Sequence, residues 1–308
     1  MTPSVIDHPL PSTLSPSKIT AFTNCPLAFR FSVVERLPEL PSAAALKGTL
    51  VHRALEILFS EHERGKRSRQ AAQEALSRAW RELLEGDELA SLELGEDAAA
   101  GFIADAGILV DRYFELENPD GVRAVGLELK LTTELNGVTV RGIIDRLDEL
   151  DDGSLAVVDY KTGRAPRIEQ SKSRLSGVQM YALMCEAEMG RRPAVVRLLY
   201  LRDRVVISAA PTDQAMRGTR QRALGVWSAI ERACRKDDFR PNPSTLCRYC
   251  SFQAYCPAFG GDPALAALSL GPTRLAERAA ERPALAVAGV GGVEGVRAAA
   301  AGSGGLLA

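Results

Sequence analysis

The sequence predicts an α/β fold, in which helices flank a mixed sheet that contains a three-stranded antiparallel meander. Three early stretches, 43–64, 68–86 and 96–117, carry apolar residues at helical spacing. From about residue 122 the spacing changes to two, so that apolar and polar residues alternate as they do in half-buried strands. Helices followed by strands, with one more helix between the later strands, give a layered α/β arrangement.

Two turns divide the meander into its strands. Asn136-Gly137 is the strongest short hairpin signal, and the second strand, VTVRGIIDRLDEL, follows it. Asp151-Asp152-Gly153 is the second turn, and SLAVVDYK is the third strand. A helix over 171–190 then precedes two more strands, AVVRLLYL and VVISAA, and a long helix over 212–236.

The two ends of the chain differ in composition from its middle. Residues 1–14 are rich in Pro and Ser and are expected to be flexible, whereas Ser15-Pro16 is a typical helix start. Residues 261–308 are rich in Ala and Gly and are expected to form a flexible tail. We therefore expect one domain over residues 15–260.

Charge and hydropathy exclude several classes of protein. The 308 residues include 38 basic and 39 acidic ones, so any nucleic-acid contact has to come from local basic clusters. No apolar run approaches the length of a membrane span, and the first residues lack the pattern of a signal peptide. We expect a cytoplasmic protein without a membrane partner, whose six cysteines serve a metal, a cluster or the core.

Three carboxylates are predicted to form a row across the meander. A two-residue loop at 136–137 places Glu128 opposite Asp145, and a three-residue loop at 151–153 places Asp145 opposite Asp159. Like charges about 5 Å apart destabilise a sheet, unless a hard divalent cation neutralises them. The alternative is the polar face of an exposed sheet.

Lys161 adds a cation beside this row. Asp159 and Lys161 are two residues apart on a strand and project to the same face. Taken alone, such a pair is most simply a surface salt bridge. Beside a metal, however, a lysine can orient an attacking water or stabilise charge that develops on a phosphate. The set is therefore typical of phosphodiester hydrolysis.

His52 lies at the beginning of an apolar helix in KGTLVHRALEILF. A lone histidine in such a helix is more often structural than a metal ligand. Gly48 and Thr49 are small and indicate a close approach to a neighbouring backbone, which favours a site.

Cys247, Cys250 and Cys256 form a C-x2-C-x5-C motif. A fourth thiol is needed for a four-coordinate site, and Cys25, which is also followed by proline, is the candidate. Zinc and a [4Fe–4S] cluster both use four thiolates, so the spacing leaves both open. Two further cysteines fall in predicted helices and are interpreted as core thiols: Cys185 and Cys234.

Basic residues cluster at four places, 64–69, 172–174, 202–204 and 217–222. Each cluster alone is typical of a solvated helix face or loop. Together they could supply contacts to the backbone of a nucleic acid.

These motifs together resemble a known family. The segments Gly48–His52 (G-x-x-x-H), Gly142–Asp145 (G-I-I-D) and Val158–Gly163 (V-D-Y-K-T-G), with the cysteine motif, are similar to the RecB-type exonucleases of the PD-(D/E)XK superfamily. The resemblance is to the iron–sulfur branch, which includes AddB and the CRISPR-adaptation nucleases, and it covers about residues 15–260.

The resemblance implies a restriction-endonuclease-like core and a role for each matching position. His52, Asp145 and Asp159 would bind Mg²⁺ or Mn²⁺. The Tyr160 carbonyl would be a further ligand and Glu128 an auxiliary one. Lys161 would act in catalysis with the two aspartates. The four residues implied to hold a [4Fe–4S] cluster that joins both ends of the domain are Cys25, Cys247, Cys250 and Cys256.

The chain departs from the family in one motif. The family usually has Q-x-x-x-Y on the helix after the lysine, but Gln179 and Tyr181 are two apart here, about 200° around a helix. Only one of them is then expected to face the site, and Gln179 is preferred. The chain also lacks a G-x-x-x-x-G-K-[ST] loop, so we expect unwinding to need a helicase or repair-complex partner.

Three functions are compared. The first is a metal-dependent exonuclease that hydrolyses single-stranded DNA or DNA ends in repair or recombination. The alternative is a non-catalytic iron–sulfur or zinc protein that binds DNA or acts as a scaffold in a repair complex. The presence of Asp145, Asp159 and Lys161 argues for the first. A zinc-stabilised interaction module would leave the carboxylate row unexplained.

Overall fold

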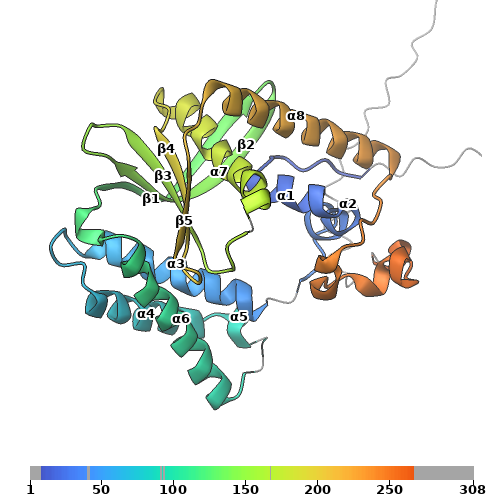
Figure 1. The fold of residues 1–308 in the computed structure, drawn as a ribbon. Helices are drawn as coiled ribbons and strands as arrows, with labels where there is room; N and C mark the ends of the chain where they lie inside the picture. Colours follow the sequence, from blue (N-terminus) through green and yellow to red (C-terminus); the bar gives the residue numbers. More distant parts are fainter. Residues whose placement is uncertain (1–7, 40–41, 91, 93, 167, 267–308) are drawn as a thin grey trace, which may run out of the picture. The chain divides into compact units, whose positions relative to one another are not determined.

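A computed structural model describes residues 8–266, apart from 40, 41, 91, 93 and 167. Its centre is a five-stranded sheet in the order β1-β2-β3-β4-β5 (Figure 1). Neighbouring strands are antiparallel, except for the parallel pair β3 and β4, which α7 connects. This confirms the predicted mixed sheet with its meander. The strands are β1 (Ala124–Leu135), β2 (Val138–Glu149), β3 (Leu155–Lys161), β4 (Val195–Tyr200) and β5 (Val205–Ala209).

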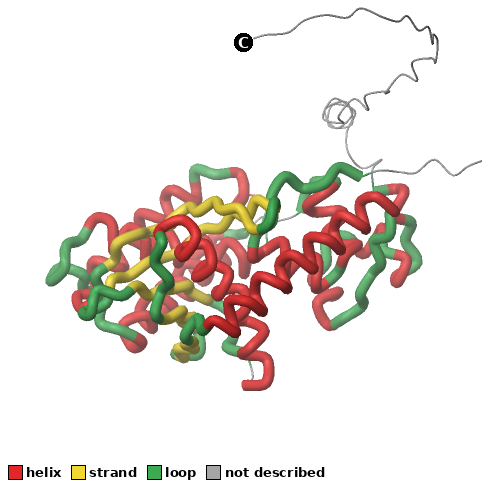
Figure 2. The backbone as a smooth tube through the Cα atoms, turned by 90° about the horizontal axis from the view of Figure 1, so that it is seen from above, coloured by secondary structure: helices red, strands yellow, loops and turns green. Residues whose placement is uncertain are grey.

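Helices cover both faces of the sheet (Figures 1 and 2). The predicted long helices form to within about three residues of their expected ends. The helices are α1 (Pro16–Asn24), α2 (Pro26–Phe29), α3 (Ala43–Glu61), α4 (Arg69–Leu84), α5 (Asp87–Ala90), α6 (Glu96–Leu116), α7 (Ile168–Met189) and α8 (Asp213–Lys236). A π-helix, Arg30–Val34, and short 3₁₀ turns complete the described part of the chain.

Two hydrophobic cores result from this layering. The first core lies between the sheet and α7, with α1 and α8 packed against α7. The second core lies between the other face and the helices α3, α4 and α6. Three of the helices begin at serine caps, since the side chains of Ser15, Ser42 and Ser68 accept backbone hydrogen bonds three residues on.

The predicted strand registers are confirmed. Asn136 and Gly137 have φ of 52° and 80°, as the tight turn requires, and Leu129 pairs with Ile144. Arg146 pairs with Val158 in the second hairpin. Both pairings follow the registers that place Glu128, Asp145 and Asp159 across from one another.

The expectation that residues 1–14 are flexible is wrong for residues 8–14. Leu14 is buried, and its backbone exchanges hydrogen bonds with Thr139 and Arg141 of β2. His8 is buried as well, and its Nε2 lies 2.7 Å from Asp237 Oδ1. Partners distant in sequence, which composition does not reveal, hold this segment. Residues 1–7 and most of the predicted tail, 267–308, lie outside the described residues.

No helix in the described ranges is both long and apolar enough to cross a membrane.

Candidate active site

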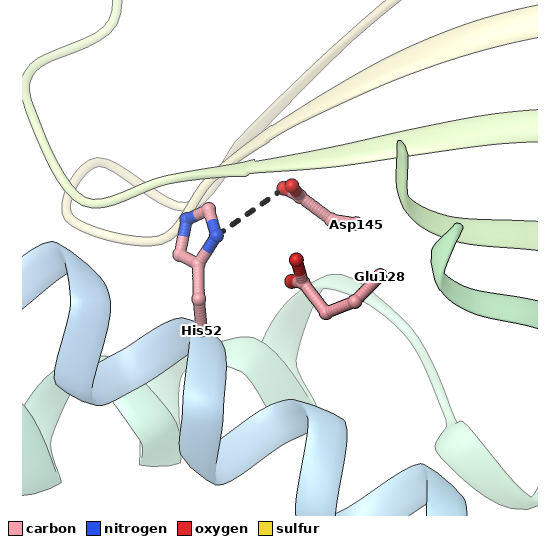
Figure 3. A group of neighbouring side chains, drawn as sticks. All are labelled: His52, Glu128 and Asp145. Atoms are coloured by element: carbon pink, nitrogen blue, oxygen red, sulfur yellow. Dashed lines mark ion pairs between the residues drawn. The ribbon is translucent and has the colours of Figure 1, made fainter. Parts of the chain in front are cut away.

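His52, Glu128 and Asp145 meet between α3 and the sheet. Figure 3 shows His52 rising from α3 toward the two carboxylates, which come from β1 and β2. One ligand atom from each of the three residues lies within 4.8 Å of the other two. His52 Nδ1 is 3.5 Å from Asp145 Oδ2. One imidazole nitrogen and two carboxylates, all partly buried, are a set of donors suited to a divalent cation.

In β1 and β2, successive side chains stop pointing to alternate faces of the sheet at Glu128 and Asp145. Leu127 packs against the second core and Leu129 against the first, although residues two apart should share a face. Glu128, between them, has φ of 43°, a left-handed conformation that is uncommon outside glycine. On β2, Ile144 and Leu147 both join the first core, so the pleat changes face beside Asp145 as well. Such strain is frequent at functional sites.

The Tyr160 peptide group links His52 to Asp145. The Tyr160 N–H donates to Asp145 Oδ2 at 2.7 Å, and the Tyr160 carbonyl accepts from His52 Nε2 at 3.0 Å. A carbonyl can only accept, so Nε2 carries the proton. In the neutral ring, Nδ1 then presents its lone pair on the side of Asp145, as a metal ligand requires.

The carboxylates at the site repel one another, and this repulsion shifts the pKa values of the neighbouring groups. Burial lowers the pKa of His52, but its hydrogen bond to Asp145 and the charges of both aspartates outweigh burial and raise it overall. Burial raises the pKa of Glu128, and the charge of Asp145 adds to this. Burial, helped by Asp145, raises the pKa of Asp159 to about 6 against the pull of Lys161. A bound cation would relieve this repulsion.

Asp159 and Lys161 form the ion pair that their spacing predicts. The Lys161 ammonium contacts Asp159 Oδ2, and no other described residue donates a hydrogen bond to this buried oxygen. The side chain of Asp159 is 8% exposed and that of Lys161 43%. Burial lowers the pKa of Lys161, but the charge of Asp159 raises it overall, so the ammonium stays charged. Asp159 is thus turned toward Lys161. The predicted principal ligands were His52, Asp145 and Asp159, but the residues that lie within 4.8 Å of one another are His52, Asp145 and Glu128.

On α7 the structure favours Tyr181 and not Gln179. The Gln179 carboxamide accepts a hydrogen bond from Thr219 of α8 at 3.3 Å, away from the sheet. Burial raises the pKa of Tyr181, and the charges of Asp159, Asp145 and Glu128 add to it. Tyr181 is therefore close enough to interact electrostatically with the carboxylates, whereas Gln179 bonds to α8, and the role of either residue at the site stays a prediction. A Cβ on Gly142 would stand 2.8 Å from Tyr181 Cε1, so the glycine makes room for this ring.

Arg146 is a site-supporting residue that sequence reasoning missed. Its side chain is 0% exposed. It donates to Asp148 at 2.8 and 2.9 Å and to the Tyr160 hydroxyl at 2.7 Å. It also pairs with Glu117, which follows α6, and its guanidinium lies over the ring of Phe59 on α3. Arg146 thereby connects the elements that carry His52, Asp145 and Asp159. The only signal in the sequence was the Asp-Arg-x-Asp run at 145–148.

The four predicted cluster cysteines line one cavity of about 310 Å³. All four are free and partly buried. Burial raises the pKa of the Cys250 thiol, and charges on the other three cysteines add to it, so the four are neighbours. In the described part of the chain, no three of these sulfurs come within 4.8 Å of one another. The four cysteines are Cys25, Cys247, Cys250 and Cys256.

The sequence pattern of the PD-(D/E)XK nuclease superfamily matches residues 13–257, and the chain belongs to this superfamily. The five-stranded mixed sheet with its flanking helices is the nuclease core of that family. Fold and family together define a nuclease.

Several relatives were found by sequence. One component of the ATP-dependent helicase/deoxyribonuclease of Streptococcus mutans is 30% identical over 167 residues, which cover 52% of this chain but only 14% of that protein. The Gene 69 protein of Mycobacterium phage L5 is 24% identical over 289 residues, and the match covers 80% of this chain and 96% of that protein. A solved structure of an exonuclease-like protein from Eubacterium rectale is a distant likeness, with a TM-score of 0.46 at 11% identity over 78% of this chain and 87% of that one.

Proposed function

We propose that the protein is a divalent-metal-dependent DNA exonuclease, which hydrolyses phosphodiester bonds in single-stranded DNA or at DNA ends. The observation that carries this proposal is the group of His52, Glu128 and Asp145 within 4.8 Å, beside the Asp159–Lys161 pair. A histidine of α3 beside a row of acids and a lysine of the sheet has little structural use but suits metal-assisted hydrolysis.

Each residue has a distinct task under this proposal. Mg²⁺ or Mn²⁺ would be held by His52, Glu128 and Asp145, with Asp159 as a further ligand when it releases Lys161. The Tyr160 carbonyl accepts from His52 Nε2, on the side of the ring away from Nδ1, so it would join the set only if this hydrogen bond is released. The bound cation would lower the pKa of a water and neutralise charge on the phosphate.

Lys161 and Tyr181 would act on the substrate rather than on the metal. The partly exposed Lys161 ammonium can orient the attacking water or stabilise the charge on the phosphate. The Tyr181 hydroxyl stays protonated and is a donor toward a phosphate oxygen.

We also propose that the four cysteines hold a [4Fe–4S] cluster. Thiolates around a tetrahedral zinc at about 2.3 Å lie only about 3.8 Å apart. The four cysteines line one cavity of about 310 Å³, which would leave room for an inorganic cluster. A brown anaerobic preparation with iron and sulfide in equal amounts is expected. Stoichiometric zinc without iron would contradict the cluster.

A partner with a helicase motor is proposed from the relatives. The Streptococcus protein is named as part of a helicase/deoxyribonuclease, and the present chain matches only a small portion of its length. We infer a role in DNA repair or recombination in such a complex.

End-labelled DNA tests the proposed function. Wild-type protein should shorten single-stranded or double-stranded DNA with Mg²⁺ or Mn²⁺, and EDTA should stop it. Lys161→Ala and Asp159→Ala should each reduce the rate by at least about 10²-fold, in line with the loss of one transition-state contact. The matched control Lys130→Ala removes an exposed lysine from β1 and should be unaffected. Absence of cleavage with either metal, or full activity of both site variants, would contradict the proposal.

A further inference from the structure

We propose that the exposed face of α8 binds the phosphodiester backbone of DNA at a distance from the active site. This inference rests on the proposed function in one respect, which is that DNA is the substrate. It goes further by assigning a binding surface to a helix that takes no part in the chemistry.

The face is defined by six exposed cations on one helix. Successive residues turn by about 100°, so these six spread over roughly 200° of the helix, the arc that its buried residues, such as Met216, Ala223 and Ile230, leave exposed. The basic cluster at 217–222, singled out from the sequence, supplies half of them. The six are Arg217, Arg220, Arg222, Arg232, Arg235 and Lys236.

None of these six side chains forms an ion pair or hydrogen bond with another described residue. The two acids of α8 are engaged elsewhere. Asp213 pairs with Arg192 at 2.6 Å, and Glu231 accepts a hydrogen bond from Trp227 Nε1 at 3.0 Å. The basic face therefore keeps its charge available for a partner.

Charge is separated in this chain, although its net charge is only −1. The helix α6, on the other side of the sheet, carries five acids and one arginine. Two of these acids are paired, Asp105 with Lys47 and Glu115 with Arg204, so a polyanion would be attracted to α8 in preference to α6. A uniformly solvated surface would not require this separation.

The chemistry of the face fits nucleic acid better than an acidic protein. No large apolar side chain of α8 is among the exposed ones of the described chain, whereas protein interfaces usually have an apolar centre. Small exposed residues, Gly218, Gly225 and Ser228, lie between the cations and leave room for a backbone to approach. From 217 to 236 the helix rises by about 28 Å, enough to follow several successive phosphates.

The position of α8 determines what the face can influence. It packs on α7 and α1, and Figure 1 shows it on the far side of α7 from α3 and hence from His52. Its cations cannot touch the scissile phosphate. They would hold the DNA that extends from the site, so their loss should weaken binding and raise KM rather than slow the chemical step.

Salt-dependent binding tests the inference. Fluorescence anisotropy would measure binding of labelled single-stranded and duplex DNA to the full chain, at several salt concentrations and with Ca²⁺ in place of Mg²⁺. Each lost phosphate contact lowers the slope of log Kd against log salt by about 0.7 for single strands and 0.9 for duplex. The triple variant Arg217→Gln/Arg220→Gln/Arg222→Gln should lower it by about 2 to 3, and Arg232→Gln/Arg235→Gln/Lys236→Gln should do the same.

Two further variants serve as controls. Replacing the first three arginines by lysine keeps the charges and should preserve the slope. The triple variant Lys47→Gln/Arg78→Gln/Arg123→Gln has the same change in net charge, but these cations are already paired with Asp105, Glu61 and Glu149. It should bind DNA like the wild type.

The outcomes separate the two proposals. Unchanged slopes in both α8 variants overturn the assignment of this face, even if the wild type cleaves DNA. Reduced slopes in a wild-type background that cleaves no DNA support the face and overturn the nuclease proposal. If the slope of log Kd against log salt falls equally in the paired-cation control, only net charge matters, which also overturns the assignment.

Discussion

Glu128 combines a charged side chain with a strained backbone. Its left-handed φ of 43° turns the carboxylate toward His52 and Asp145, and both burial and a neighbouring carboxylate oppose its ionisation. The charges of His52 and Arg53 offset these costs only in part, since the pKa of Glu128 is still raised, which indicates that the position is kept for a ligand.

Replacing Glu128 by glycine or alanine separates these two costs. Both variants lose the carboxylate, so both should need about 10- to 100-fold more Mn²⁺ for half-maximal cleavage. Glycine accepts the left-handed backbone and alanine does not, so Glu128→Gly should be more stable than Glu128→Ala by about 1 kcal/mol in urea unfolding. Equal metal requirements in wild type and variants would remove Glu128 from the site.

Asp159 should make the metal-free protein sensitive to pH. Its pKa is about 6 in the fold, against an ordinary value of 3.8, so the folded chain holds this proton more tightly than the unfolded chain. Stability is consequently lost as the pH rises from about 4 to 6. In EDTA, Asp159→Asn should melt at a higher temperature than wild type above pH 6, and the two should converge below pH 4.

Asp152 provides a control of opposite sign for that experiment. It is fully exposed, and its hydrogen bonds with Ser154 lower its pKa. Asp152→Asn should therefore lose rather than gain thermal stability above pH 4. If Asp159→Asn melts below wild type at pH 7, the carboxylate is stabilised by Lys161 and the site needs no cation.

Among the elements, α7 is positioned by a single glycine. Gly142 on β2 lies under Tyr181, where an added Cβ would also stand 3.1 Å from Met184 Sδ. The close approach brings the Tyr181 hydroxyl toward the carboxylates, and it explains why the glycine of the G-I-I-D motif is needed.

Gly142→Ala should push α7 away from the sheet. Overpacking of this kind costs about 1 to 3 kcal/mol, and cleavage should fall with it because Tyr181 moves. Gly177→Ala is the matched control on α7, since its Cβ would meet nothing within 4 Å. It should be neutral or stabilise the helix by up to about 1 kcal/mol. Wild-type activity of Gly142→Ala would show that Tyr181 has no part in the reaction.

Arg146 positions the helices of the second core against the sheet, as Gly142 positions α7. Arg146→Met would leave Glu117 and Asp148 without their buried partner, and removing one side of such a network costs about 3 to 5 kcal/mol. Urea unfolding should show this loss. Leu76→Ala, which truncates an apolar residue of the same core, should cost a comparable amount, about 2 to 5 kcal/mol. Only Arg146→Met should also raise the metal requirement at equal folded fraction, because it frees Tyr160.

Sequence reasoning succeeded where local chemistry dictates geometry. Asn136-Gly137 permits one kind of turn, so the opposition of Glu128 and Asp145 could be predicted. It failed where a residue distant in sequence determines which way a side chain points. Nothing near Gln179 shows that Thr219 binds it, and nothing near Arg146 shows that Glu117 and Tyr160 enclose it. The left-handed turn at Glu128 was also invisible, because it follows from two cores competing for one strand.

At the scale of the whole molecule, three sites with different chemistry are built from different elements of one fold. The acidic centre lies between the sheet and α3, and the basic face lies on α8 beyond α7. The cysteine cavity joins Cys25 near the beginning of the domain to Cys256 near its end. Under the proposed function and the proposed α8 face, cleavage, DNA binding and closure of the chain would belong to separate elements, so each can be tested by its own variants.

The most direct test of the metal centre is a crystal structure of the protein soaked in Mn²⁺, with an anomalous difference map. We expect a peak within coordination distance of His52 Nδ1, Asp145 and Glu128, which should vanish in crystals of Asp145→Asn. A well-ordered site without such a peak, or a peak elsewhere that survives Asp145→Asn, would contradict the assignment of these residues as metal ligands.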